Sequence, residues 1–379
     1  MRIKKICVIT DQYPTENDPI YSFLDEVVCR FADRGIECIV ICPKPIFERH
    51  HKASSRIRYT ATGAKIKIYC PKYIPCSGIE IGKVKMWKYS MYNIYESAYR
   101  TFIRYVRSCD VIYAHFYKNG IIASKIAQKK NIPVFVASGE SSFDTGLKFY
   151  KAFSKEISKL NGVIAVSSDV KNRIYKYGLL PQNNNIIVLP NGVNMTNFKK
   201  LEKEVCRKKL GIPNDLFIVA FVGHFIERKG INRVIDAVNA CQDVYAFFIG
   251  DNALPNPCDK ALFVGKVPHN EVSIYLSAAD AFILPSTDEG CCNAIVEAQV
   301  MELPIIASRL PFNEDILPGE SAVLVDPMNT EDIINAFLKL KNDKYFLNKM
   351  VGESHKLAPE RDIEIRIEKI LSFIEKTIY

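Results

Sequence analysis

Several common sequence signatures are absent from this chain of 379 residues. No run of about 18 uninterrupted apolar residues occurs, so we expect no transmembrane helix. The apolar run after Met1 ends at Asp11, too early for a signal peptide, and we therefore expect a cytoplasmic protein. None of the 12 cysteines stands in a C-x-x-C pair, which argues against structural zinc and favours a reducing compartment.

Two common nucleotide-binding motifs are also missing. The loop after the first expected strand, residues 10–19, contains no G-x-G-x-x-G, which disfavours a dinucleotide-dependent dehydrogenase. No G-x-x-x-x-G-K-[ST] is present, so the chain has no P-loop. No Asp-x-Asp pair stands at a strand end either, and we expect no bound metal and no cofactor.

The charge that is present is distributed unevenly. Residues 1–180 carry 30 Lys+Arg and 15 Asp+Glu, a net charge of +15. The remaining residues carry 21 Lys+Arg and 27 Asp+Glu, a net charge of −6, so the whole chain carries +9. Between Arg49 and Arg107 there are 13 basic residues but only two acidic ones, Glu80 and Glu96. Such a field attracts phosphates, nucleic acid or anionic lipid. No nucleic-acid-binding motif occurs, so nucleic acid is not an expected partner.

Buried strands alternate with helices in both halves of the chain. The length and an apolar content of 48% fit two or three globular domains. The alternation predicts parallel, doubly wound sheets, whose ligands bind at the carboxyl ends of the strands. The expected strands are residues 3–9, 36–42, 66–70, 110–116, 132–138, 162–167, 186–189, 216–222, 245–250, 261–266, 281–284, 304–307 and 322–325. The expected helices are residues 22–34, 83–107, 170–177, 231–239, 272–279, 293–301, 330–340 and 362–378.

The expected helix at residues 83–107 has two interpretations. Its apolar face comprises Val84, Trp87, Met91, Ile94, Ala98, Phe102 and Tyr105, and most of its basic residues fall elsewhere. One interpretation is a core helix that covers a sheet and has a solvated basic side. The other is a helix that lies on an anionic membrane surface.

A turn with two cations follows the strand at residues 216–222. It runs from Gly223 through Arg228 and Lys229 to Gly230 and leads into a helix. Arg binds phosphate with a planar fork and Lys adds a compact charge, so the turn suits a diphosphate. An ordinary exposed Arg-Lys pair is the alternative.

Two glutamates, Glu289 and Glu297, flank the start of the expected helix at residues 293–301. Eight positions of helix span at most roughly 12 Å, the scale of one extended ligand. A carboxylate only accepts hydrogen bonds, so it suits hydroxyl groups of a sugar or a ribose. The helix start between them offers free N–H groups to a diphosphate. Two solvated surface residues are the alternative.

These elements together resemble the family-4 retaining glycosyltransferases. The resemblance rests on Gly-x4-Arg-Lys-Gly from Gly223, on Glu-x7-Glu from Glu289, and on Pro-Asn-Gly-Val from Pro190. It implies the α/β GT-B fold, two doubly wound Rossmann-like domains that face a central cleft. The implied domains are an acceptor-binding domain at 1–188, a nucleotide-sugar-binding domain at 189–358, and a helix at 359–379 that packs back on the first domain. Gly192 would then take a positive φ in a hinge, unless the segment is an ordinary loop.

The resemblance also implies roles for individual residues. His115, Arg228, Lys229 and Glu289 would be catalytic, with His115 beside the donor sugar, although it could instead cap its strand. Glu140 would contact the acceptor, or alternatively cap a helix. The residues implied in donor binding are Gly223, Arg228, Lys229, Val267, Glu289, Gly290, Cys291, Cys292, Asn293, Ala294, Ile295 and Glu297.

The implied activity is metal-independent, retaining transfer of a sugar from a nucleotide-diphosphate sugar, the co-substrate. The acceptor would be a glycan, lipid-linked in surface polysaccharide synthesis, and the enzyme could be peripheral at the inner face of the cytoplasmic membrane. Two departures from the family pattern bear on this. Cys291 and Cys292 stand where relatives often have an aromatic and a small residue, and residues 10–34 contain no glycine. The alternatives are an epimerase or hydrolase that acts on a sugar nucleotide, and a non-catalytic nucleotide-sugar-binding protein.

Overall fold

The computed structural model describes residues 2–15, 20–48, 54–76, 80–81, 84–141, 143, 146–196, 198–251 and 253–379. Contacts divide the chain into two compact units. The first comprises Met1–Val166, Val170–Leu189 and Ile367–Tyr379, and the second comprises Ser167–Asp169 and Pro190–Arg366.

The first unit contains a sheet of eight strands within the described residues, in the order β12-β11-β10-β9-β1-β2-β5-β4. All neighbours are parallel except β4 and β5, which form an antiparallel edge. Seven of the strands were expected from the sequence, and β4 was not. The bounds are β1 Lys5–Ile9, β2 Glu37–Ile41, β4 Ser55–Tyr59, β5 Lys65–Tyr69, β9 Val111–His115, β10 Val134–Ser138, β11 Gly162–Ala165 and β12 Ile186–Val188.

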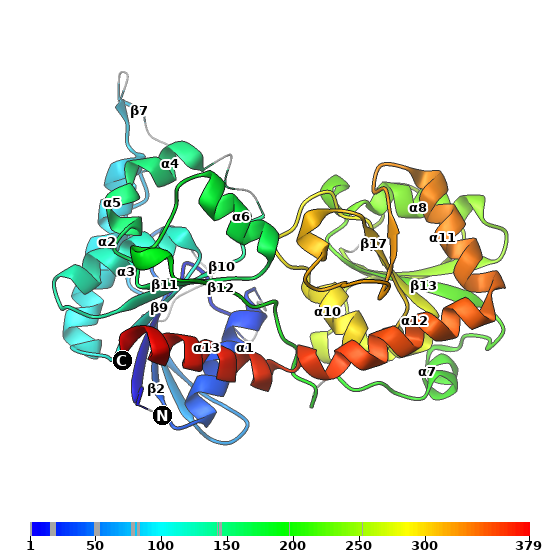
Figure 1. Ribbon diagram of the computed structural model, residues 1–379, viewed down its shortest axis with the longest axis horizontal. Helices are drawn as coiled ribbons and strands as arrows, with labels where there is room; N and C mark the ends of the chain where they lie inside the picture. The colour runs from blue at the N-terminus through cyan, green and yellow to red at the C-terminus, as the bar shows by residue number, and fades with distance from the viewer. Residues whose placement is uncertain are drawn as a thin grey trace. The chain divides into compact units, whose positions relative to one another are not determined.

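Helices cover both faces of this sheet, as the doubly wound prediction requires. Helices α1 and α13 lie on one face, and α2, α3, α5 and α6 lie on the other (Figure 1). The ring of Phe373 in α13 packs against that of Phe135 in β10, with centroids 5.7 Å apart. The bounds are α1 Ser22–Asp33, α2 Trp87–Thr101, α3 Tyr117–Gln128, α4 Leu147–Ala152, α5 Ser154–Ile157, α6 Ser168–Lys176 and α13 Ile363–Ile378. Two short ladders pair β3 (Lys44–Pro45) with β6 (Lys72–Tyr73), and β7 (Glu80–Ile81) with β8 (Val84–Lys85).

The expected helix at residues 83–107 begins later and changes character before it ends. Lys83 lies outside the described residues, α2 begins at Trp87, and a π-helix at Phe102–Val106 follows it. Met91, Ile94, Ala98 and Phe102 are buried, as predicted. The prediction was wrong for Tyr105, which is 44% exposed and stacks on Tyr69. The wider turn of the π-helix shifts the phase of the later residues away from the buried face.

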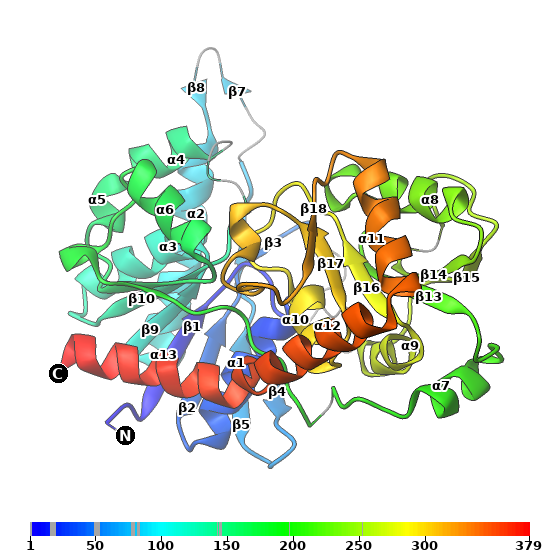
Figure 2. The same cartoon turned by 45° about the vertical axis from the view of Figure 1, so that its right-hand side comes forward.

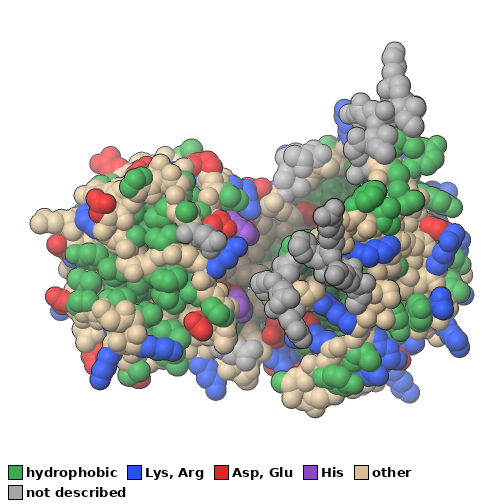
Figure 3. All heavy atoms as spheres, turned by 180° about the vertical axis from the view of Figure 1, so that it is seen from behind, with side chains coloured by type: hydrophobic (Ala, Val, Ile, Leu, Met, Phe, Trp, Pro, Cys, Tyr) green, Lys and Arg blue, Asp and Glu red, His purple; other side chains and the backbone are tan. Residues whose placement is uncertain are grey.

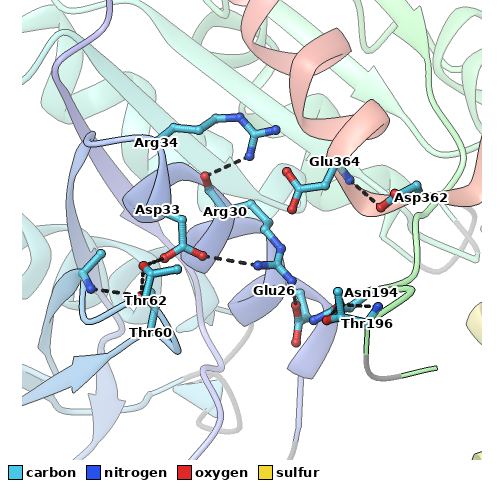
Figure 4. A network of polar contacts seen from close by, with 11 residues as sticks. Glu26, Arg30, Asp33, Arg34, Thr60, Thr62, Asn194, Thr196, Asp362 and Glu364 are labelled. Atoms are coloured by element: carbon cyan, nitrogen blue, oxygen red, sulfur yellow. Dashed lines mark hydrogen bonds and ion pairs between the residues drawn. The ribbon is translucent and has the colours of Figure 1, made fainter. Parts of the chain in front are cut away.

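A polar network attaches the end of α1 to the turn between β4 and β5. Arg30 lies 3.7 Å from Glu26 and 3.3 Å from Asp33, both on its own helix. The Asp33 carboxylate accepts a hydrogen bond from Thr62, which in turn bonds Thr60 (Figure 4). These contacts fix the exposed edge of the sheet against the helix that follows β1.

The second unit contains a parallel sheet of six strands within its described residues, in the order β15-β14-β13-β16-β17-β18. Helices α8 and α11 cover one face, and α9 and α10 cover the other (Figure 2). All six strands were expected, whereas α7 and α12 were not. The bounds are α7 Lys203–Leu210, β13 Phe217–Gly223, α8 Ile231–Ala240, β14 Val244–Gly250, β15 Ala261–Gly265, α9 Val272–Ala278, β16 Ala281–Leu284, α10 Asn293–Val300, β17 Ile305–Ser308, β18 Val323–Val325, α11 Thr330–Asn342 and α12 Lys344–Leu357.

Three properties of the described residues bear on the exclusions drawn from the sequence. No helix among them has the length and apolar character needed to span a bilayer. All 12 cysteines are free thiols, and Cys7, Cys38 and Cys42 are buried. Within the same residues, no group of three or more His, Cys, Asp or Glu is arranged to hold a metal ion.

The segment that begins at Pro190 is attached to the residues before α13. Val193 N donates to Arg361 O at 2.8 Å, and Ile363 N donates to Val193 O at 3.0 Å. Gly192 does not take the positive φ that its turn predicted. A Cβ at Gly192 would lie 2.8 Å from Ile363 Cα. Glycine is therefore required here for close backbone approach, not for an unusual φ.

We expect Gly192→Ala to lower the free energy of unfolding by roughly 1–3 kcal/mol, because the added methyl group meets backbone that cannot rotate away. Gly352→Ala is the matched control. Nothing lies within 4 Å of a Cβ at this helical position, so alanine should stabilise by about 0.5–1 kcal/mol. Urea unfolding measures both. A Gly192→Ala variant as stable as the parent would contradict the close-approach explanation.

Candidate functional site

Three glycines form the carboxyl edge of the second sheet. Gly223, Gly250 and Gly265 are the last residues of β13, β14 and β15. Gly223 and Gly265 both have φ 148°, and a Cβ at Gly250 would lie 1.9 Å from Gly223 O. A backbone without side chains lets a ligand approach closely. Gly250 and Gly265 were not among the predicted site residues, although each ends an apolar run as Gly223 does.

The turn after β13 packs against the turn after β16. Arg228 and Lys229 lie in a 3₁₀ turn, Glu227–Lys229, that leads to Gly230. Thr287 N donates to Arg228 O at 2.9 Å. Gly230 has φ 78°, and a Cβ there would lie 2.6 Å from Pro285 O. Only glycine therefore allows the two turns to meet.

This packing brings together Arg228, Lys229 and Glu289, three of the four residues predicted to be catalytic. Glu289 Oε1 lies 2.6 Å from Lys229 Nζ and 3.1 Å from Arg228 Nη1. Glu289 is only 8% exposed, and the Arg228 guanidinium also donates to the carbonyl of Asp288. One carboxylate thus faces two cations, so the cluster retains a positive charge to offer an anion.

Lys229 stays charged in this environment. Burial of Lys229 opposes its charge, but the Glu289 carboxylate beside it favours the charged form, and the pKa of Lys229 lies above the ordinary lysine value. The Cys292 Sγ is 3.8 Å from Lys229 Nζ. Burial raises the pKa of the Cys292 thiol, so at neutral pH it is protonated and is no nucleophile.

The second predicted glutamate, Glu297, lies in α10 and has a different partner. Its carboxylate is 3.0 Å from His269 Nε2, and the His269 ring lies 4.9 Å from that of Phe198. His269 was not predicted as a site residue, although it stands two positions after Val267, which was. A polar partner of Glu297 is therefore supplied by the segment that follows β15.

The start of α10 holds the remaining predicted donor residues. The Asn293 side chain accepts a hydrogen bond from Asn191 Nδ2 at 2.7 Å, and Asn191 N lies 3.5 Å from Cys291 Sγ. Burial raises the pKa of Cys291 to about 11. Asn191 was missed as a supporting residue because its partners lie 100 and more positions away. Gly290, Ala294 and Ile295 complete this helix start, and all three are buried.

In the first unit, His115 ends β9 and is 6% exposed. The rings of Tyr21, Phe23 and Phe116 lie around it, with centroids 5.2, 5.1 and 4.0 Å from the imidazole. The strand-end position confirms where the prediction placed His115. Its role beside a sugar stays a prediction.

Glu140 follows β10 and occupies the position of a helix cap. Its Oε1 accepts from Tyr117 N, the first residue of α3, at 2.6 Å, and its Oε2 accepts from Ser138 Oγ at 2.6 Å. The structure thus shows the capping alternative that the sequence left open. Burial raises the pKa of the Glu140 carboxyl, against the opposing effect of these hydrogen bonds.

Comparison with known proteins agrees with this architecture. Residues 22–197 match the sequence model of Glycosyltransferase Family 4, and residues 202–357 match that of Glycosyl transferases group 1. TuaC of Bacillus subtilis (strain 168), named for teichuronic acid biosynthesis, is 26% identical over 354 residues, 90% of each chain. An Escherichia coli UDP-Gal:alpha-D-GlcNAc-diphosphoundecaprenol alpha-1,3-galactosyltransferase is 24% identical over 69% of this chain and 74% of its own.

The fold comparison points the same way. Anabaena Alr3699/HepE, solved in complex with UDP and glucose, superposes with a TM-score of 0.75 at 16% identity, over 98% of this chain and 100% of its own. The fold is therefore GT-B. The chain belongs to the family-4 glycosyltransferases, and similar proteins include ones named for teichuronic acid and capsular polysaccharide biosynthesis.

The raised pKa of Glu140 should make its contribution to stability depend on pH. Because its folded pKa lies above the unfolded value, its contribution to stability is complete below the unfolded pKa and is lost as the pH rises through the folded pKa. The free energy of unfolding of the parent, minus that of Glu140→Gln, should therefore be larger at pH 4 than at pH 7. Chemical denaturation at both pH values measures it. A larger difference at pH 7 would show that the two hydrogen bonds outweigh burial.

Proposed function

We propose that this glycosyltransferase moves a sugar from a nucleotide-diphosphate sugar to a glycan acceptor with retention of anomeric configuration. The observation that carries the proposal is the cluster of Arg228, Lys229 and Glu289 at the glycine edge of the second sheet. Two cations held at a backbone without side chains suit a diphosphate. HepE, which shares the fold, binds UDP and UDP-glucose, which supports a nucleotide-sugar donor.

The chemistry follows from the charge that develops on the donor. As the bond from the anomeric carbon to the phosphate oxygen breaks, its electron pair remains on the diphosphate. Arg228 and Lys229 would stabilise that charge without a divalent metal, a contribution that is usually among the largest in catalysis. The acceptor hydroxyl would attack from the same face and pass its proton to the departing phosphate oxygen. Transfer undiminished by EDTA is the expected sign of metal independence.

The other site residues would orient the two substrates. Glu289 and His115 would accept or donate hydrogen bonds at the donor sugar, and Glu297 would bind the ribose hydroxyls. Glu140 would act on the acceptor through the α3 terminus that it caps. Val267 and the start of α10 would lie along the nucleotide and its diphosphate.

We expect Lys229→Met to reduce kcat by about 10²–10³-fold, because a cation facing the leaving group is lost. Lys349→Met is the matched control, since Lys349 is an exposed lysine of the same unit that pairs only with Glu320 among the contacts described. Proton NMR of the product of the parent enzyme should show the anomeric configuration of the donor. Full activity of Lys229→Met, or an inverted product, would contradict the proposal. Donor consumption without any acceptor would instead indicate a hydrolase or epimerase.

A lipid-linked acceptor is the second part of the proposal. The E. coli relative is named for an acceptor on diphosphoundecaprenol. Helix α2 and the π-helix after it expose aromatic and aliphatic side chains, with Tyr89 57%, Tyr92 56% and Ile103 38% exposed. Lys88 and Arg104 are exposed beside them. Lys and Arg side chains also lie among hydrophobic ones on the face of this unit drawn in Figure 3. Such a surface suits the headgroups of anionic lipid at the inner face of the membrane.

The membrane contact is tested by sedimentation with vesicles of phosphatidylglycerol and phosphatidylcholine at low salt. The parent should bind these vesicles but not phosphatidylcholine alone. Lys88→Glu combined with Arg104→Glu should weaken binding by at least tenfold, since each cation near the surface contributes about 1 kcal/mol. Lys349→Glu, with its charge change in the other unit, should bind as the parent does. Equal binding by both variants would refute this surface.

A further inference from the structure

The turn that follows His115 contains a backbone conformation that residues other than glycine rarely adopt. Phe116 has φ 67° and ψ 154°, a region of backbone space occupied almost only by glycine. Strand β9 ends at His115 and α3 begins at Tyr117, so Phe116 alone makes the connection. A glycine would make the same turn without strain. The chain therefore keeps a phenylalanine ring at this position against a conformational cost.

The surroundings hold this conformation from both sides. Asn119 Nδ2 donates to His115 O at 2.6 Å, which fixes the peptide before Phe116. Phe116 N donates to Ala137 O at 2.8 Å, and the Glu140 carboxylate accepts from Tyr117 N at 2.6 Å. Strain that persists under such constraint is typical of functional sites.

A second aromatic residue with positive φ meets the first. Tyr21, directly before α1, has φ 59° and ψ 35°. Its ring lies edge-on to Phe116 at 5.7 Å and to His115 at 5.2 Å. Phe23 adds a third ring, 5.5 Å from Tyr21 and 5.1 Å from His115. Two loops that follow neighbouring strands, β1 and β9, therefore place one cluster at the carboxyl edge of the first sheet.

The cluster is not an ordinary part of the hydrophobic core. Tyr21, Phe23 and Phe116 are each half-buried, whereas the core aromatics Phe31 and Tyr113 of the same unit are fully buried. Burial first, and then the Asp11 and Glu140 carboxylates, raise the pKa of Tyr21, so its hydroxyl remains a hydrogen-bond donor. Aromatic side chains beside a few polar groups are typical of the lining of small-molecule sites. The C–H face of a pyranose ring fits such rings, and its hydroxyls fit the polar groups beside them.

We propose that Tyr21, Phe23 and Phe116 surround His115 as an aromatic receptor for the apolar face of a sugar ring, and that the strained backbone at Phe116 serves to aim its ring at that sugar. This inference rests on the proposed glycosyl transfer and deepens it. The sugar ring comes either from the donor or from the acceptor, and the two sources are separated by the experiment.

The test uses Tyr21→Leu and Phe116→Leu, which remove a ring but keep apolar bulk. Tyr175→Leu is the control, because Tyr175 is an exposed tyrosine of α6 in the same unit. Calorimetry compares UDP with UDP-glucose and UDP-galactose as probes. Saturation-transfer NMR follows the methyl glycosides of glucose, galactose and N-acetylglucosamine.

If the cluster holds the donor sugar, both ring variants should bind the UDP-sugars about tenfold more weakly and UDP alone unchanged. If it holds the acceptor sugar, donor binding should be unchanged and the saturation-transfer signal of a glycoside should fall about tenfold. The proposal is overturned if both variants match the parent in both assays, or if the parent shows neither a preference for a UDP-sugar over UDP nor a glycoside signal. Lys229→Met distinguishes failure of this proposal from failure of the proposed function. If Lys229→Met loses UDP binding while the ring variants bind every probe as the parent does, only the aromatic receptor is refuted.

The strain is tested separately with Phe116→Gly and Phe116→Ala. Both variants lack the ring, but only alanine must keep the unfavourable φ. Phe116→Gly should therefore melt at least about 2–4 °C above Phe116→Ala, and both should lose the sugar response. Equal melting temperatures would show that the backbone at Phe116 stores no strain, and the aiming role would be rejected.

Discussion

The contact of Glu289 with Lys229 and Arg228 is the interaction on which the proposed donor site depends. It joins two turns that are 60 residues apart in the chain. They meet because β13 and β16 are parallel neighbours, with Val219 opposite Ala281, so their carboxyl ends lie at one edge. The Glu289 carboxylate is largely buried, so its attraction to the two cations is weakly screened by water. Because two cations face one carboxylate, the cluster keeps a net positive charge. An anionic ligand can therefore bind without the cluster having to assemble first.

Polar side chains lie at both edges of each sheet, and their contacts differ between the amino and the carboxyl edge. At the amino edge, carboxylates satisfy backbone. Asp280 accepts from Ile218 N and from the buried Arg207 of α7, and Asp110 accepts from the backbone of β1. At the carboxyl edge, carboxylates also accept from backbone, as Glu140 does from Tyr117 N, but the charged cluster at Glu289 and the strained backbone at Phe116 lie there as well.

Much of this was predictable, and the failures have identifiable causes. The parallel strands followed from short apolar runs, and the turn that carries Arg228 and Lys229 lies directly after such a strand, as expected. Helix α7 was missed because its sequence is mostly polar and its buried residues are only Cys206 and Arg207. The predicted burial of Tyr105 was wrong because a pattern with a period of 3.6 residues does not reveal a π-helix. The reason for Gly192 was wrong because its constraint is Ile363, far along the chain.

The sequence by itself determined what is local: which runs form strands, where turns place glycines and cations, and so the family. Only the tertiary structure decided which side chains meet. It paired Glu297 with His269, set Asn191 against Asn293, and made Glu140 a cap for α3. The physical reason is that periodicity reports burial along one element. Hydrogen bonds and ion pairs depend on distances of about 3 Å between elements, which packing alone sets.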